Sequence, residues 1–199
     1  MKKYNILFLD FDGVFNGIGL RDWKNNRYSL DKDLGGVMSK IIPDYKTKWQ
    51  HFDVDIFYSK VKILIEALRD IPDLKIVLST SWRNLKTPHE FDTAFKAIPG
   101  WTFDIIGKTG HDKHSIRGKE IKSWLELNCN LVKHYVILDD ETIDMLPEQA
   151  DHIVKTSVVL GITHKDAIKI KKKMNNKGAC NERLKERSTI CIRDKRRTK

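Results

Sequence analysis

The sequence predicts an α/β fold with a central, mostly parallel sheet. The apolar run at residues 6–9 has no polar alternation, which is typical of a strand buried on both faces of a parallel sheet. Similar runs alternate with segments of helical periodicity along the 199 residues, and this alternation is the pattern of α/β domains. At this length, one domain with room for an insertion or a tail is expected.

The first expected strand ends in two carboxylates, Asp10 and Asp12, which are followed at once by Gly13. Glycine lets the chain turn away without steric cost. Open α/β sheets bind their ligands at the carboxyl ends of parallel strands. Two carboxylates there repel each other unless a cation neutralises them, and Mg²⁺ prefers oxygen ligands. The pattern indicates either such a cation site or an acidic, solvated turn.

Residues 17–56 are too long for a simple loop in a compact domain. We interpret this segment as a small, partly helical, cap-like insertion over the mouth of the sheet. Its rings could stack on a base or a sugar, although such residues more often form a small satellite core. They are Trp23, Tyr28, Tyr45, Trp49, His51 and Phe52.

Beyond the insertion, strand-like and helix-like patterns alternate. The segment 57–70 is the clearest helix, because Val61, Leu64, Ile65 and Leu68 recur at helical spacing. The predicted elements are a helix at 57–70, a strand at 75–78, a helix at 91–98, a strand at 101–106, a helix at 116–125, strands at 135–138 and 152–156, and a helix at 166–174.

Polar residues follow the second strand, as Ser79-Thr80-Ser81-Trp82-Arg83. Hydroxyl groups and backbone N–H groups at a strand end suit phosphoryl oxygens. The guanidinium of Arg83 matches phosphate geometry. Taken alone, a Ser-Thr-Ser cluster is more often a helix cap.

Charged residues also mark two later elements. Arg117 and Lys119 open the helix predicted at 116–125, where the helix dipole disfavours cations, so either an anionic partner or a surface ion pair is expected. Asp139-Asp140 follows the strand at 135–138, and Asp144 lies shortly after it. This is a second acidic cluster at a strand end.

The histidines and cysteines predict no zinc site. His111 and His114 lie in a polar segment without further ligands, so we interpret them as loop residues. Cys129, Cys180 and Cys191 have no metal-ligand spacing, and their odd number favours a reducing, cytoplasmic compartment. No signal-peptide pattern and no apolar run of about 20 residues is present, so a membrane location is not expected.

The net charge is concentrated at one end. Residues 165–199 hold 14 Lys and Arg against 4 Asp and Glu, which accounts for the whole net charge of +10. A basic tail on a neutral domain suggests contact with a polyanion such as nucleic acid. A solubilising tail is the alternative, and we expect residues 175–199 to be flexible in either case.

Four of these features together resemble the haloacid dehalogenase (HAD) superfamily of phosphotransferases. Its motifs at successive strand ends are Asp-x-Asp, a Ser or Thr, a Lys or Arg that opens a helix, and an acidic pair. Here they correspond to Asp10-Phe11-Asp12, then Ser79-Thr80, then Arg117 or Lys119, then Asp139-Asp140. The resemblance implies a Rossmann-like three-layer sandwich over residues 1–174.

A finer pattern is similar to the HAD domain of Swiss-army-knife RNA repair proteins. The pattern comprises Ser-Trp-Arg at 81–83, Arg-Gly-x-Glu-Ile-x-x-Trp-Leu from 117, Ile-Leu-Asp-Asp at 137–140, Lys-Thr at 155–156 and Gly-Ile-Thr at 161–163.

The resemblance implies a Mg²⁺-dependent phosphomonoesterase. Asp10 would be the nucleophile that forms an aspartyl-phosphate, and Asp12 would protonate the leaving oxygen and then activate water. Magnesium would bind the Asp10 carboxylate, the backbone carbonyl of Asp12 and an acid of the fourth motif. Asp140 is the preferred direct ligand with Asp139 beside it, and a related motif form would use Asp140 with Asp144.

The remaining site residues would bind the phosphoryl group. Ser79 is preferred over Thr80 because it directly follows the strand. Arg117 is preferred over Lys119 as the charge clamp because it begins the helix. Three further residues are expected to line the phosphate-binding region: Gly13, Ser81 and Arg83.

The substrate is less tightly specified than the reaction. The RNA-repair resemblance and the basic tail favour a nucleotide or a phosphorylated nucleic-acid end, and the aromatic insertion is compatible with stacking on a base. One alternative is a small-metabolite or protein phosphatase with an unrelated tail. Another is a non-catalytic protein that binds phosphate or nucleic acid, although the presence of both Asp10 and Asp12 argues against a silent enzyme.

Overall fold

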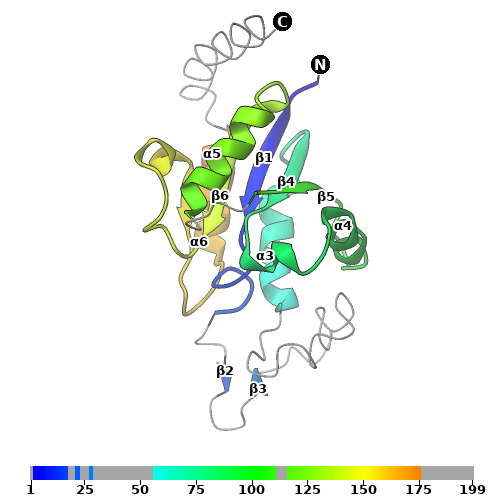
Figure 1. Cartoon of the computed structure of the whole chain (residues 1–199). Coiled ribbons are helices and arrows are strands. Elements are labelled where there is room, and N and C mark those ends of the chain that lie inside the picture. The colour runs from blue at the N-terminus through cyan, green and yellow to red at the C-terminus, as the bar shows by residue number, and fades with distance from the viewer. Residues whose placement is uncertain (1, 18–20, 23–26, 29–55, 111–115, 176–199) are drawn as a thin grey trace, which may run out of the picture.

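A computed structural model describes residues 2–17, 21–22, 27–28, 56–110 and 116–175. Its central strands are β1 (Tyr4–Leu9), β4 (Leu74–Leu78), β5 (Asp104–Lys108), β6 (Val132–Asp139) and β7 (Ile153–Lys155). They form one sheet in the order β5-β4-β1-β6-β7, and all four neighbouring pairs are parallel (Figure 1). The predicted α/β fold with a parallel sheet is confirmed.

The described helices are α3 (Tyr58–Leu68), α4 (Pro88–Lys96), α5 (Arg117–Leu127) and α6 (His164–Asn175), with 3₁₀ segments η2 (Ser81–Asn84) and η3 (Pro147–His152). The four predicted helices are confirmed. Sequence periodicity missed η2 and η3, because one or two 3₁₀ turns leave no repeating apolar pattern. No described helix has the length and apolar composition needed to cross a membrane.

The predicted third strand is misplaced by three residues. Trp101 and Phe103 lie before β5 and pack in the core, where the Trp101 ring contacts Phe95 at a centroid distance of 4.6 Å. The indole Nε1–H of Trp101 donates to the carbonyl oxygen of Phe103 at 3.0 Å. The apolar residues at 101–103 therefore mark a buried turn rather than the strand itself.

Only a short pair of strands is described within the predicted insertion at 17–56. These are β2 (Arg21–Asp22) and β3 (Arg27–Tyr28), which pair antiparallel. The rest of the insertion lies outside the described residues, and so do the two loop histidines, two of the three cysteines and most of the basic tail. The predictions of a cap-like insertion over the mouth of the sheet, a flexible tail and a domain boundary near residue 174 remain predictions.

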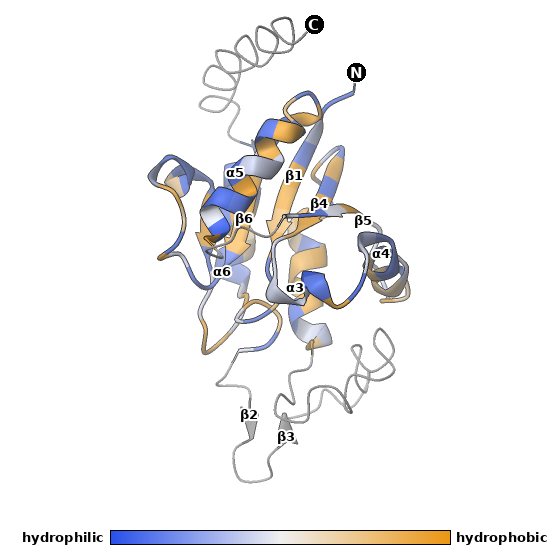
Figure 2. Ribbon diagram, viewed as in Figure 1, coloured by the Kyte–Doolittle hydropathy of each residue, from blue (hydrophilic) through white to orange (hydrophobic). Residues whose placement is uncertain are grey.

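The two faces of the sheet are covered by different helices. Leu7 and Leu9 of β1 belong to a large core cluster that includes residues of α3, α4 and α6. Ile6 and Phe8 point to the opposite face and pack in a smaller cluster with Ile121 of α5. Figure 2 shows the hydrophobic residues gathered on these central strands. This arrangement is the predicted three-layer sandwich.

The strand ends lie side by side because the strands are in register. Leu9 of β1 pairs with Leu78 of β4 and with Leu138 of β6. Beyond these pairs, the Asp10 N–H donates to the Leu138 carbonyl at 3.0 Å, and the Ser79 N–H donates to the Leu9 carbonyl at 2.9 Å. Residues from distant parts of the sequence therefore meet at one edge of the sheet.

The chain that leaves β1 is held by the segment after β7. The Thr156 hydroxyl donates to the Gly13 carbonyl at 2.8 Å, and the Ile162 N–H donates to the Val14 carbonyl at 2.8 Å. Gly161 has a φ of 65°, and a Cβ there would lie 2.6 Å from the Val14 carbonyl oxygen. Only glycine fits this position, which explains the Gly-Ile-Thr pattern.

A buried ion pair joins η2 to α5. The Arg83 Nη2 lies 2.7 Å from the Glu120 Oε2, and the two side chains are 6% and 2% exposed. Arg83 also donates through Nη1 to the Thr80 carbonyl at 2.7 Å. The pair fixes the segment after β4 against the helix that begins with Arg117.

Glu120→Gln should destabilise the fold by about 3–5 kcal/mol, because it leaves the Arg83 charge buried without its counter-ion. Asp70→Asn is the matched control. It breaks the ion pair between Lys171 and Asp70, whose carboxylate is 75% exposed, and should cost about 0–1 kcal/mol. Urea unfolding of both variants measures the difference, and equal costs would contradict a positioning role for the buried pair.

Candidate active site

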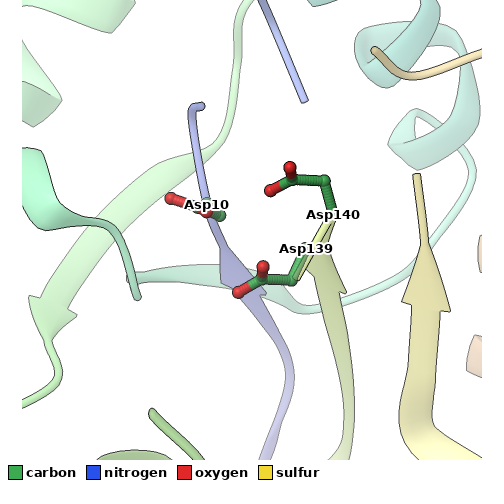
Figure 3. A group of neighbouring side chains, drawn as sticks. All are labelled: Asp10, Asp139 and Asp140. Atoms are coloured by element: carbon green, nitrogen blue, oxygen red, sulfur yellow. The ribbon is translucent and has the colours of Figure 1, made fainter. Parts of the chain in front are cut away.

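Three carboxylates converge at the carboxyl ends of β1 and β6. Asp10 directly follows β1, Asp139 is the last residue of β6, and Asp140 comes next. One oxygen from each lies within 4.8 Å of the others, and Figure 3 shows the three side chains gathered at the ends of these two strands. Asp10 and Asp139 are buried. The structure thus brings together the two acidic strand ends that the sequence predicted.

This crowding disfavours the charged forms of the three acids. Burial raises the pKa of Asp10 to about 6, although the nearby Arg117 guanidinium lowers it. Burial, followed by repulsion from Asp10, raises the pKa of Asp139 to about 8. Burial also raises the pKa of Asp140. The site is therefore short of positive charge.

The donor set fits a hard divalent cation. Three carboxylate oxygens within reach of one point are the ligands that Mg²⁺ prefers. The buried Asp139 Oδ2 has no hydrogen-bond partner among the described residues, although it lies 3.6 Å from the Arg117 Nε. A bound cation would supply the missing partner and reduce the repulsion among the acids.

Arg117 stands between two of these acids. Its Nη1 lies 3.6 Å from the Asp10 Oδ1 and its Nε 3.6 Å from the Asp139 Oδ2. Burial lowers the pKa of Arg117, but the surrounding carboxylates outweigh this effect, so its pKa is raised overall. Lys119, the alternative clamp, is exposed on α5 and has no described contact with the three acids. The geometry favours Arg117.

Asp144 stabilises the start of α5, where the helix dipole disfavours the positive charge of Arg117. Asp144 accepts the backbone N–H of Arg117 at 2.9 Å, and its carbonyl accepts the N–H of Gly118 at 3.2 Å. A Cβ at Gly118 would lie 2.6 Å from the backbone nitrogen of Leu146, so the close approach needs glycine. Asp144 therefore orients α5 and is not among the three clustered carboxylates.

Gly13 makes room for the cluster. Its φ is 62°, and a Cβ there would lie 2.1 Å from the Asp140 Cγ. Its N–H donates to the Asn16 Oδ1 at 2.9 Å, while its carbonyl accepts from Thr156. The predicted substrate contact by Gly13 stays a prediction, and its observed role is to let the turn pass beside Asp140.

Ser79 and Thr80 have different surroundings. Among the described residues, the Ser79 Oγ has no hydrogen-bond partner although it is buried, and Ser79 follows Leu78, which pairs with Leu9 just before Asp10. The Thr80 Oγ1 accepts the backbone N–H of Trp82 at 3.3 Å and so caps η2, and its hydrogen bond to Asp10 favours the charged form of that acid. The unpartnered hydroxyl of Ser79 suits a ligand, whereas Thr80 orients its neighbours.

Ser81 and Arg83 lie on η2 and have protein partners. Ser81 is exposed, and its hydroxyl donates to the Asp12 Oδ2 at 3.3 Å. Arg83 is held by Glu120 and by backbone carbonyls, although its Nε is buried without a partner. Their contact with substrate stays a prediction.

The Asp12 carboxylate is not one of the three clustered acids, although its charge contributes to the raised pKa values of Asp10 and Asp140. Its Oδ1 accepts from the Asn16 Nδ2 at 3.0 Å, and its Oδ2 accepts from the Trp82 Nε1 at 2.7 Å. The predicted metal ligand from Asp12 is its backbone carbonyl. Its carboxylate is therefore not needed for metal binding and can serve in the predicted proton transfer.

Sequence reasoning gave no role to Trp82, Asn16, Glu120 or Thr109. Thr109 directly follows β5 and is buried with an unpartnered hydroxyl. The only sequence signal for Trp82 and Glu120 was that both belong to the finer pattern. Their polar neighbours gave no sign that the two side chains are buried. The partners of Asn16 and Thr109 depend on tertiary contacts.

The sequence is similar to a known protein family. The family described as the HAD domain in Swiss Army Knife RNA repair proteins matches residues 6–167. No curated protein matches the sequence significantly. Among solved structures, a predicted phosphatase from Clostridium acetobutylicum is 14% identical with a TM-score of 0.38, and the match covers 94% of this chain and 98% of that one.

The carboxylate cluster should make the metal-free protein less stable as the pH rises. Unfolded carboxyls ionise near 3.8, whereas the folded state holds these protons up to about 6 at Asp10 and about 8 at Asp139. The folded state binds more protons in this window, so its stability is largest at the acidic end and is lost through these pKa values.

Thermal unfolding of the metal-free wild type and of Asp139→Asn, each at pH 6 and pH 8, tests this expectation. From pH 6 to pH 8, the free energy of unfolding of the wild type should fall by at least about 1 kcal/mol more than that of the variant. Added Mg²⁺ should stabilise the wild type more at the higher pH. A wild type that gains stability relative to the variant as the pH rises would contradict the account.

Proposed function

This chain belongs to the family of HAD phosphatase domains found in Swiss Army Knife RNA repair proteins, and from that premise we propose a specific reaction. The protein is a Mg²⁺-dependent phosphomonoesterase that works through an aspartyl-phosphate and removes a phosphate from a nucleotide or a nucleic-acid end. The observation that carries the proposal is the meeting of Asp10 with Asp139, Asp140 and Arg117 beside the unpartnered Ser79 hydroxyl.

Asp10 is the nucleophile in this proposal. The Phe11 N–H donates to its Oδ1 at 2.8 Å, which orients the carboxylate at the end of β1. A carboxylate oxygen attacks phosphorus, the bond to the leaving oxygen breaks, and Asp12 gives that oxygen its proton. Asp12 then takes a proton from water, the water oxygen attacks phosphorus, and Asp10 and inorganic phosphate are released.

Asp10, Asp139 and Asp140 would hold Mg²⁺, with the Asp12 carbonyl as a further ligand. When bound, the cation offsets the charge of the phosphate, so that a carboxylate can approach a dianion. Arg117 adds a second positive charge beside Asp10. The Ser79 hydroxyl donates a hydrogen bond to a phosphoryl oxygen, and such preorganised donors stabilise the charge that develops there.

The proposed substrate class is supported by the family match and by the positive charge of residues 165–199. The family takes its description from RNA repair proteins, whose substrates include nucleic acid by that description. The excess of 10 positive charges within residues 165–199 would attract a polyanion. A 3′- or 5′-phosphorylated oligonucleotide is therefore the substrate class proposed, and a mononucleotide is the smaller form of the same chemistry.

Asp10→Asn should abolish turnover while preserving the fold, because an amide is a poor nucleophile. We expect the rate of phosphate release to fall by on the order of 10⁴-fold or more. Phosphate release is measured with Mg²⁺ for oligonucleotides phosphorylated at either end, nucleoside monophosphates and a generic aryl phosphate. Turnover by the variant at the wild-type rate would refute the assigned nucleophile, and full activity in excess chelator would refute the metal requirement.

Ser79→Ala should lower kcat by on the order of 10²-fold, as expected for the loss of one preorganised donor to a phosphoryl oxygen. The fold should tolerate the change, because the hydroxyl has no protein partner to lose. Ser123→Ala removes an exposed hydroxyl on α5 and should leave kcat unchanged. A wild-type kcat in Ser79→Ala would contradict the role of Ser79 and would mean that another group contacts the phosphoryl oxygen.

A further inference from the structure

The Asp12 side chain is held by donors from two different parts of the chain. The Trp82 Nε1–H on η2 donates to its Oδ2 at 2.7 Å, and the Asn16 Nδ2 on the turn after β1 donates to its Oδ1 at 3.0 Å. The Ser81 hydroxyl adds a longer contact of 3.3 Å to Oδ2. An acid of the Asp-x-Asp motif is therefore fixed by direct contacts with the Ser-Trp-Arg motif.

Both principal donors are themselves fixed. The Gly13 N–H donates to the Asn16 Oδ1 at 2.9 Å, which leaves the Asn16 amide nitrogen facing Asp12. Trp82 is 7% exposed, and its ring packs edge-on against Phe11 at a centroid distance of 5.9 Å. Neither donor can turn away without losing these contacts.

The clamp separates Asp12 from the cation site. Its carboxylate is not one of the three that share a common point, although it lies only two residues from Asp10. Trp82 and Ser81 both donate to Oδ2, whereas Asn16 is the one donor to Oδ1 among the residues that the structure describes. Because a carboxylate oxygen has two acceptor positions, Oδ1 keeps one free for a transferable proton.

We propose that Trp82 is a positioning residue for proton transfer: its indole N–H holds the Asp12 carboxylate away from the cation site and aims it at the leaving oxygen. This inference rests on the proposed function, in which Asp12 protonates that oxygen. Trp82 itself touches no reacting atom and acts through Asp12. Asn16 supports the same carboxylate from the other side.

The leaving group distinguishes this role from a structural one. An alkyl phosphate needs a proton on its departing oxygen, whereas nitrophenolate leaves readily without one. A misplaced Asp12 should therefore slow the first substrate much more than the second. A general loss of folding or of active enzyme would slow both equally.

Trp82→Phe keeps an aromatic ring and removes the N–H donor together with the five-membered part of the indole. We expect kcat/KM for an alkyl phosphate to fall by on the order of 10- to 100-fold, within the range that a positioned acid supplies, and kcat/KM for nitrophenyl phosphate to change by less than about threefold. Half-saturation by Mg²⁺ should not change. Asp12→Asn should show the same dependence on the leaving group, and Trp82→Phe should add little to it.

Trp101→Phe is the matched control. It removes a buried indole hydrogen bond to the Phe103 carbonyl, far from Asp12 in the sequence and with no described contact to it. It should leave kcat/KM unchanged for both substrates. Asn16→Ala provides a second variant should Trp82→Phe unfold, and its loss should again be larger for the alkyl phosphate.

The outcomes distinguish failure of the positioning role of Trp82 from failure of the proposed phosphatase function. Equal losses for both substrates, or no loss, in Trp82→Phe and Asn16→Ala would overturn the positioning role while leaving the phosphatase in place. Wild-type hydrolysis that persists unchanged in Asp10→Asn would instead overturn the proposed function on which the inference rests.

Discussion

The burial of acidic side chains beside one another is the constraint on which the site depends, with Asp10 and Asp139 buried and Asp140 half-buried next to them. Parallel pairing of β1 with β6 forces Asp10 and Asp139 together at the strand ends, and Asp140 follows on the same edge. Within the described part of the chain, one guanidinium, that of Arg117, lies within 4 Å of two of them. The arrangement is costly for a metal-free protein. A divalent cation would offset it, because its two charges and that of Arg117 balance three carboxylates.

Much of the surrounding structure places this one guanidinium. Asp144 accepts the first N–H of α5, and the Arg83–Glu120 pair anchors the same helix one turn later. Gly118 lets the chain after β6 approach the helix closely. Each named residue of the Arg-Gly-x-Glu pattern therefore has a physical role. Arg117 brings a cation to the site, Gly118 permits a close backbone contact, and Glu120 is the buried counter-ion of Arg83 on η2.

The sequence predicted what depends on local pattern and strand order. Runs such as residues 6–9 identify buried strands, and polar residues directly after them must share one edge of a parallel sheet. The sequence favoured Arg117 over Lys119 only from its place at the start of the helix, because it does not reveal which side of α5 faces the sheet. It also missed the contact of Trp82 with Asp12, since 70 residues separate them and no periodicity links them. The strand predicted at 101–106 was shifted because a buried turn and a strand look alike in a short apolar run.

The most direct test of the account is to find where the phosphate resides during turnover. The protein would be mixed with Mg²⁺ and a radiolabelled, phosphorylated oligonucleotide, quenched in acid within one turnover, and digested for peptide mapping. The account predicts label on the peptide that contains Asp10, and its absence in Asp10→Asn. Release of labelled phosphate with no labelled protein at any time point, or label on another residue, would contradict it.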